Sequence, residues 1–171
     1  MAELPKRKPT RLKGYDYSQN GAYFVTVCTK NRKEILGQII DGNTGDDAGV
    51  VPKIELSEYG EIVHKYISRI KGIEKYVIMP NHVHMIIAIQ AEKDGTMWAS
   101  SPTQSIPQLI QYFKIMVTKE IGFSVFQRSF HDHIIRNERD YQKIWEYIDT
   151  NPIRWKEDCF YPGQAEREQS L

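Results

Sequence analysis

The stretch YVIMPNHVHMIIAI, residues 76–89, constrains the fold more than any other part of this chain. Its apolar residues form two runs on either side of a Pro-Asn pair that is typical of turns, which predicts a buried β-hairpin with strands over 73–79 and 82–90. His82 and His84 interrupt the second run. Side chains at i and i+2 point to the same face of a strand, so we expect the two imidazoles side by side.

Two histidines on one face of an apolar strand indicate a function. A single strand histidine is usually a hydrogen-bonded structural residue, whereas two buried and unpaired imidazoles would each cost free energy. Two neutral imidazoles close together are instead the start of a divalent metal site, which still needs a third ligand. A second pair, His131 and His133, has the same spacing, but Asp132 between them predicts a half-exposed edge strand. We interpret that pair as DNA contacts or as groups behind the metal ligands.

The length of 171 residues, 40% of them hydrophobic, suits one domain over 1–171. We expect a core from about residue 11 to about residue 155, a basic N-terminal arm over 1–20 and a polar tail over 156–171. No apolar run approaches the length of a membrane span, and the basic N-terminus lacks the apolar segment of a secretory signal.

The two cysteines, Cys28 and Cys159, lie far apart and form no CxxC pattern. They favour a reducing compartment, so we expect a cytoplasmic protein without a disulfide framework. Neither cysteine lies near the histidine pair in sequence, which argues against a structural zinc site.

The order of elements predicts an α+β fold. Residues 22–29 read as a strand, and EILGQIIDG is its expected hairpin partner, followed by a Gly- and Asp-rich loop. The segment 91–104 has no periodicity and also reads as a loop. We expect helices, each with a capping residue, over the segments that begin at Ser57, Ser105 and Asn137. This order suits a ferredoxin-like sandwich, an antiparallel sheet with its helices on one face.

The last of these helices carries an unusual tyrosine. Its apolar stripe is formed by Tyr141, Ile144, Trp145 and Ile148. At about 100° per residue, Tyr147 lies roughly 110° from the centre of that stripe, and Asn151 lies about 40° from Tyr147, one turn further on. From the helical wheel alone, the favoured interpretation of Tyr147 is an ordinary aromatic residue on the flank of the helix.

These motifs together resemble a known family. MPNHVH, followed roughly sixty residues later by YIDTNP, resembles the HUH superfamily of single-strand DNA enzymes. The likeness is greatest to the single-tyrosine transposases of small insertion sequences and to their domesticated relatives, the REP-associated tyrosine transposases. It extends from Arg11 to Trp155 and includes GAYFVTVCTKNR and FQRSFHDHIIRNERDY.

The resemblance implies a mechanism. It implies that His82 and His84 hold Mg²⁺ or Mn²⁺, with Asn151 as third ligand, although insertion-sequence members more often have Gln at that position. It implies that Tyr147 attacks DNA and forms a 5′-phosphotyrosine. The alternative tyrosines are Tyr141 and Tyr112.

The resemblance also implies that the partner is single-stranded or hairpin DNA. Basic clusters would contact its phosphates. A homodimer is implied if the chain is like the mobile members, and a monomer if it is like the domesticated ones. The expected DNA contacts are Arg11, Lys13, Lys30, Arg32, Lys33, Arg128, His131, His133 and Arg136.

Two other functions remain open from the sequence. The chain could be a domesticated protein that binds a DNA or RNA hairpin without cutting it. It could also be a phosphodiesterase that uses water, with Tyr147 in a structural role.

Overall fold

The computed structural model describes residues 14–42, 51–90 and 105–162. The expected DNA contacts Arg11 and Lys13 lie outside these residues, as do most of the Gly- and Asp-rich loop, the loop over 91–104 and the end of the tail. Within the described residues, no helix is long and apolar enough to cross a membrane. The elements are β1 Gly21–Cys28, the 3-10 turn η1 Lys30–Arg32, β2 Gly37–Gly42, β3 Val51–Leu56, α1 Glu58–Ile67, β4 Ile73–Met79, β5 His82–Ile89, α2 Ile106–Ile121, β6 His131–Ile135, α3 Glu138–Thr150 and the 3-10 turn η2 Trp155–Glu157.

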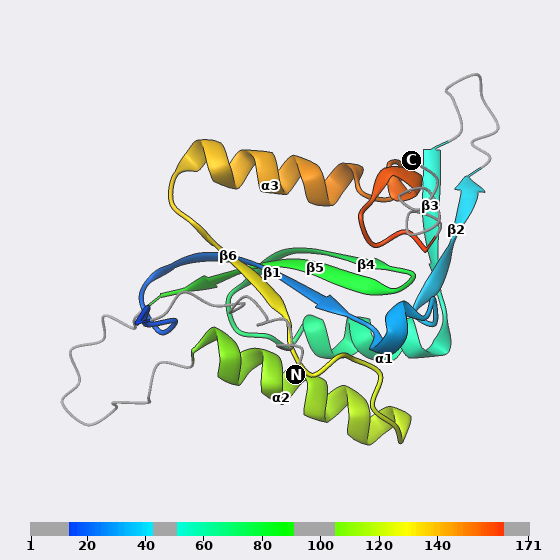
Figure 1. Ribbon diagram of the computed structural model, residues 1–171, viewed down its shortest axis with the longest axis horizontal. Helices are drawn as coiled ribbons and strands as arrows, with labels where there is room; N and C mark the ends of the chain where they lie inside the picture. The colour runs from blue at the N-terminus through cyan, green and yellow to red at the C-terminus, as the bar shows by residue number, and fades with distance from the viewer. Residues whose placement is uncertain (1–13, 43–50, 91–104, 163–171) are drawn as a thin grey trace, which may run out of the picture.

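Four antiparallel strands form the main sheet in the order β4-β5-β1-β6 (Figure 1). The predicted hairpin is present as β4 and β5, with Met79 opposite His82 across the turn. β1 lies between β5 and β6 and pairs Thr26 with His84 on one side and with His131 on the other. The predicted α+β class with an antiparallel sheet is confirmed, and β6 is an edge strand as expected.

The helices cover both faces of this sheet. α1 and α2 lie on one face and α3 lies on the other (Figure 1). The expectation that all helices share one face is therefore wrong for α3. The cause lies in β5, which is buried along almost its whole length on both faces. Val83 and Met85 join the core beneath α1 and α2, while the alternate residues, including both histidines, face α3.

A second, two-stranded sheet replaces one predicted strand pairing. We expected EILGQIIDG to form a hairpin with β1, but the structure pairs β2 with β3, from Gly37 opposite Leu56 to Gly42 opposite Val51. The strand β3 was missed because its pattern is short and contains Pro52, which weakens a strand prediction.

The helix caps formed as predicted. Ser57 accepts a hydrogen bond from the Gly60 amide at 3.1 Å, and Asn137 accepts one from the Asp140 amide at 2.9 Å. The amide of Ser105 donates to the Gln108 side chain at 2.9 Å, which is one half of a capping box. These caps fix where each helix begins, and so fix which residues of α3 meet the sheet.

Candidate active site

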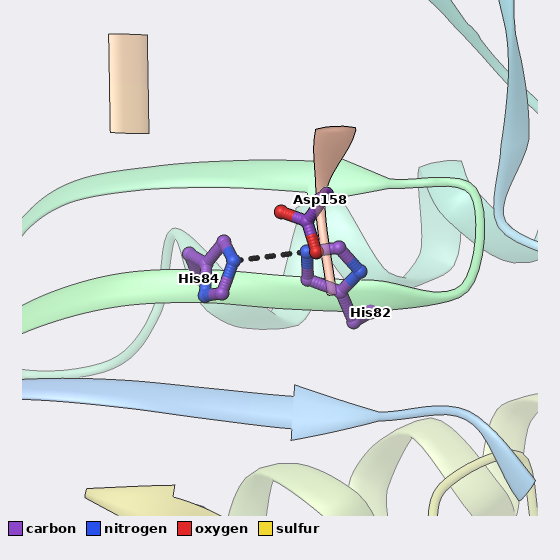
Figure 2. Close-up of side chains that lie close together, drawn as sticks. All are labelled: His82, His84 and Asp158. Carbon is purple, nitrogen blue, oxygen red and sulfur yellow. Dashed lines mark hydrogen bonds between the residues drawn. The ribbon is translucent and has the colours of Figure 1, made fainter. Parts of the chain in front are cut away.

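His82 and His84 project from β5 toward the face that α3 covers. Their Nε2 atoms lie 2.9 Å apart, and the side chains are 0% and 1% exposed (Figure 2). Both imidazoles are therefore shielded from solvent, and their Nε2 atoms point toward each other.

The outer nitrogen of each ring is held by a polar neighbour. His82 Nδ1 lies 2.9 Å from the Asn81 side-chain oxygen, and His84 Nδ1 lies 2.8 Å from the Thr26 hydroxyl. Histidines that bind metals are typically anchored in this way through the nitrogen that does not bind. The anchoring leaves both Nε2 atoms for the space between the two rings.

Asp158 completes the cluster, and the sequence analysis missed it. One carboxylate oxygen of Asp158 and one nitrogen of each histidine lie within 4.8 Å of one another. Figure 2 shows the carboxylate pointing toward the His82 ring. Asp158 follows η2, beyond the expected end of the core at about residue 155, and is only 6% exposed. No local pattern marks a lone acidic residue in a tail as a ligand, so only the folded chain identifies it.

Tyr147 reaches the cluster from α3. Its hydroxyl lies 3.2 Å from His84 Nε2 and donates to Asp158 Oδ2 at 3.1 Å. Its ring meets the edge of Phe24, which stacks on His84. The residue as a whole is 39% exposed, so the hydroxyl is inside the cluster while the ring stays open to solvent on one side.

The two alternative tyrosines lie elsewhere. Tyr112 is 65% exposed on α2, on the opposite face of the sheet. Tyr141 is not packed in a buried stripe as we expected: it is half-buried, and its hydroxyl donates to Glu74 at 2.8 Å. The fully buried residue of α3 is Ile148, near the end of the helix.

Asn151 lies at the end of α3 and is 2% exposed. Its Nδ2 donates to Asp158 Oδ2 at 2.7 Å. Its Oδ1 is buried and has no hydrogen-bond partner among the residues that the structure describes. A buried acceptor without a partner is rare and calls for an explanation, such as an ion.

These groups fit the divalent ion that the family resemblance implies. The donors are two imidazole nitrogens, a carboxylate and a buried amide oxygen that lacks a partner. Carboxylate and carbonyl oxygens suit Mn²⁺ and Mg²⁺, and neutral imidazole is a common ligand of divalent transition metals. Within the described residues, the cluster that meets metal-ligand spacing contains no cysteine, although Cys28 is the cross-strand neighbour of His82.

Burial governs the protonation of the site. It lowers the pKa of His82 to about 3, with a further contribution from the positive charge of Arg32. Burial and then the neighbouring His82 hold the pKa of His84 well below its usual value. Burial, followed by the Asp158 carboxylate, raises the pKa of the Tyr147 phenol. At neutral pH both imidazoles are therefore uncharged and the phenol keeps its proton.

The segment Trp155–Phe160 covers the histidines. The ring of Phe160 lies 4.6 Å from that of His82, and the Trp155 ring lies 5.8 Å from it, centroid to centroid. Arg32, one of the expected DNA contacts, donates to the Cys159 carbonyl at 3.2 Å and lies over the Phe160 ring. Tyr147 is therefore the most accessible member of the cluster.

The remaining expected DNA contacts lie at the surface. His131 and His133 are exposed, and their pairing with Thr26 and Phe24 places them on the same sheet face as the cluster. His133 Nε2 is also hydrogen-bonded to Asp140 Oδ2 at 2.8 Å. The Lys30 amide donates a hydrogen bond of 2.7 Å to the Val125 carbonyl. This bond joins the turn that carries Lys30 to the segment that carries the exposed Arg128. Lys33 and Arg136 are exposed.

Comparison with known proteins agrees with these features. No family model matches the chain. An uncharacterized protein of Haemophilus influenzae is 33% identical over 183 residues, which cover 94% of this chain and 96% of that protein. Another Haemophilus influenzae protein, predicted to be a REP-associated tyrosine transposase, is 23% identical over 145 residues, 81% of this chain and 74% of its own.

One solved structure shares the fold. It is a REP-associated tyrosine transposase bound to a REP hairpin, with a TM-score of 0.55 and 20% identity, and the match covers 90% of this chain and 74% of that one. The histidine pair on β5, facing a tyrosine on the last helix, is what the resemblance in sequence led us to expect. The chain thus belongs to one family with the 33% identical Haemophilus influenzae protein, and it is similar to REP-associated tyrosine transposases in sequence and in fold.

Proposed function

We propose that this protein cuts and rejoins single-stranded DNA through a covalent link to Tyr147. One observation carries the proposal: the Tyr147 hydroxyl lies within 3.2 Å of both a candidate metal ligand, His84, and a carboxylate, Asp158. A phenol needs a nearby group to take its proton and a nearby positive charge to favour attack on an anionic phosphodiester. A tyrosine that only stabilised the fold would have no need of that pair of neighbours.

The chemical step follows from this geometry. Tyr147 Oη attacks the phosphorus, and the bond from phosphorus to the 3′-oxygen breaks. The phenol proton passes to Asp158 Oδ2, which already accepts its hydrogen bond. The departing 3′-oxygen takes up a proton and becomes a 3′-OH, while the 5′-phosphate stays on Tyr147. The phosphodiester energy is kept, so a second 3′-OH can reverse the step and join strands without ATP.

Mg²⁺ or Mn²⁺ bound by His82, His84 and the oxygens of Asn151 or Asp158 would neutralise charge on the phosphate oxygens. Asn151 Nδ2 donates a hydrogen bond of 2.7 Å to Asp158 Oδ2, the oxygen that also accepts from Tyr147. It therefore orients the carboxylate whichever of the two residues binds the ion.

The substrate that we propose is hairpin-bearing single-stranded DNA. The relative of known structure is described as bound to a REP hairpin. Exposed Lys30 and Lys33 lie at the end of β1, next to the segment that covers the cluster. Because His82 and His84 are almost fully buried, a phosphate would reach them only if side chains that cover them, such as Phe160 and Trp155, move.

The decisive experiment incubates the protein with hairpin-bearing single strands from its own gene's flanks and Mn²⁺, followed by a denaturing gel. We expect a covalent protein–DNA band and a shorter strand with a free 3′-OH. Hairpin binding without cleavage would favour a domesticated binding protein. Cleavage that turns over without a covalent band would favour a phosphodiesterase that uses water.

A further inference from the structure

Asn81 lies in the turn between β4 and β5 and is completely buried. Its Oδ1 lies 2.9 Å from His82 Nδ1, and its Nδ2 donates to the carbonyls of Phe160 at 2.9 Å and Arg32 at 3.3 Å. We propose that Asn81 is a positioning residue of the metal centre, which fixes one tautomer of His82 and anchors the segment that carries Asp158. In the sequence, Asn81 is recognisable only as a turn residue.

The contacts of Asn81 determine where the proton on His82 lies. Carbonyl oxygens only accept hydrogen bonds, so the atom that faces Phe160 and Arg32 must be the amide nitrogen. The atom that faces His82 is therefore the amide oxygen, which also only accepts. His82 must then donate from Nδ1, and because its ring is neutral, Nε2 carries a lone pair that points into the cluster.

Thr26 places no such restriction on His84. A hydroxyl both donates and accepts, so the contact between Thr26 and His84 Nδ1 allows either tautomer. Two lone pairs 2.9 Å apart would repel each other, so without an ion His84 carries its proton on Nε2 and donates to His82. If both Nε2 atoms were to bind an ion, His84 would carry its proton on Nδ1 instead. Asn81 thus fixes one histidine, while Thr26 lets the other change.

Asn81 also controls the position of Asp158. It holds the Phe160 carbonyl, and the amide of Phe160 donates to Asp158 Oδ1 at 2.7 Å. The other carbonyl that it holds belongs to Arg32, whose backbone is left-handed with φ of 51°. That conformation is unfavourable for a residue with a side chain, so contacts such as the one from Asn81 help to hold it. Asn81 therefore joins the histidine strand to the carboxylate segment.

The first test uses the unaltered protein without metal. It rests on the metal site of the proposed function, but it needs no DNA. The ¹⁵N shifts of the His82 ring should show a protonated Nδ1 and an unprotonated Nε2. A His82 ring protonated on Nε2 would overturn the proposal.

Two variants separate the two roles of Asn81. Asn81→Ala removes both, so the Nδ1 tautomer of His82 should lose its preference and Mn²⁺ affinity should fall by about 10- to 100-fold. Asn81→Asp keeps an acceptor for His82 but removes the donor to Phe160. It should retain the tautomer while hydrogen exchange at the Phe160 amide becomes faster.

Thr29→Val is the matched control. Thr29 is completely buried, and its hydroxyl lies 3.0 Å from the backbone carbonyl of Asn81 and 2.8 Å from that of Lys33. The variant therefore removes a contact to the same turn without touching the Asn81 amide. It should leave the His82 tautomer and Mn²⁺ affinity unchanged. If Asn81→Ala behaves like Thr29→Val in both measurements, Asn81 is merely structural. The variants could show the expected changes in tautomer and Mn²⁺ affinity while the unaltered protein forms no covalent adduct with DNA. That result would contradict the proposed function but would still support the positioning role of Asn81.

Discussion

The Tyr147 hydroxyl donates a hydrogen bond to Asp158 across 3.1 Å, although the two residues lie on different elements. The same carboxylate oxygen accepts from Asn151, and its second oxygen accepts from the Phe160 amide. Asp158 is thus held by three donors at the point where a proton must leave the tyrosine. This arrangement makes the contribution of each partner testable.

Tyr147→Phe should abolish both strand cleavage and the covalent adduct, because it removes the attacking oxygen. Folding should change little, since losing one hydrogen bond costs about 0.5–1.5 kcal/mol. Tyr141→Phe is the matched control, because its hydroxyl contacts Glu74 outside the cluster, and it should still form the adduct. Denaturing gels measure the adduct, and thermal melts check the fold. An adduct with Tyr147→Phe would place the nucleophile elsewhere.

Asp158→Asn keeps the size of the side chain and an acceptor oxygen but removes a strong proton acceptor. We expect the cleavage rate to fall by about 10²- to 10⁴-fold, while hairpin binding persists. Asp140→Asn removes a carboxylate that pairs with His133 at the surface, and it should cleave at the normal rate. Single-turnover kinetics measure both. Cleavage by Asp158→Asn at the rate of the unaltered protein would show that the proton goes to another group.

Replacing either buried histidine should remove metal binding. His82→Ala or His84→Ala deletes a nitrogen of the cluster, so Mn²⁺ affinity by calorimetry should become too weak to measure. His131→Ala and His133→Ala are the controls and should bind normally. Anomalous density from Mn²⁺-soaked crystals gives an independent location. An ion at His131 and His133 alone would refute this assignment.

The buried histidines also predict how stability depends on pH. Burial lowers the pKa of His82 to about 3 from its ordinary value of 6.5, and burial also lowers the pKa of His84. The unfolded chain therefore binds protons that the folded chain does not. Above pH 6.5 these histidines do not reduce the free energy of unfolding. As the pH falls from 6.5 toward 3, the free energy of unfolding decreases by up to about 1.4 kcal/mol per pH unit for each histidine.

Urea unfolding of the metal-free protein at about pH 7.5 and about pH 5 measures this dependence. Other groups also titrate in this range, so the comparison is with His82→Gln. That variant should lose less stability on acidification than the unaltered protein. Equal losses in the two proteins would mean that His82 is protonated in the folded state.

DNA binding should favour single-stranded or hairpin substrates over blunt duplex and should weaken steeply with salt. The double variant Lys30→Ala, Lys33→Ala tests whether these two lysines contact DNA phosphates. It leaves Arg32 in place, which contacts the segment that covers the histidines. Each lost phosphate contact should lower the salt slope by about 1. Lys119→Ala, an exposed lysine on α2, should leave the slope unchanged. Fluorescence anisotropy measures both, and equal affinity for blunt duplex would count against the proposed substrate.

Local patterns in the sequence predicted the parts of this fold that local physics determines. The β4–β5 hairpin and the caps at Ser57, Ser105 and Asn137 depend on neighbouring residues, and each formed as expected. The pairing of β2 was wrong because the choice of strand partner depends on contacts distant in sequence. The placement of α3 was wrong because nothing local shows which face of a sheet a helix will cover.

The candidate site divides in the same way. His82 and His84 were found through strand periodicity, whereas Tyr147 was singled out by the family resemblance, because its position off the helical stripe alone favoured an ordinary aromatic residue. Asp158 gave no such signal, because a lone acidic residue in a polar tail looks like solvated surface. Its importance comes from tertiary contacts with Tyr147 and Asn151. The same holds for Asn81, whose three partners come from three separate parts of the chain.

Only Arg136 and Asn137 separate the end of β6 from the start of α3. The three residue steps from Ile135 to Glu138 reach about 11 Å at most, so at this end the tyrosine helix is tied to the sheet from which it emerges. Each copy should therefore own both its nucleophile and its histidines, and two differently damaged copies should not complement each other. A mixture of Tyr147→Phe and His84→Ala proteins should remain inactive, and in a cell a defective copy should neither be rescued by an intact one nor borrow its tyrosine.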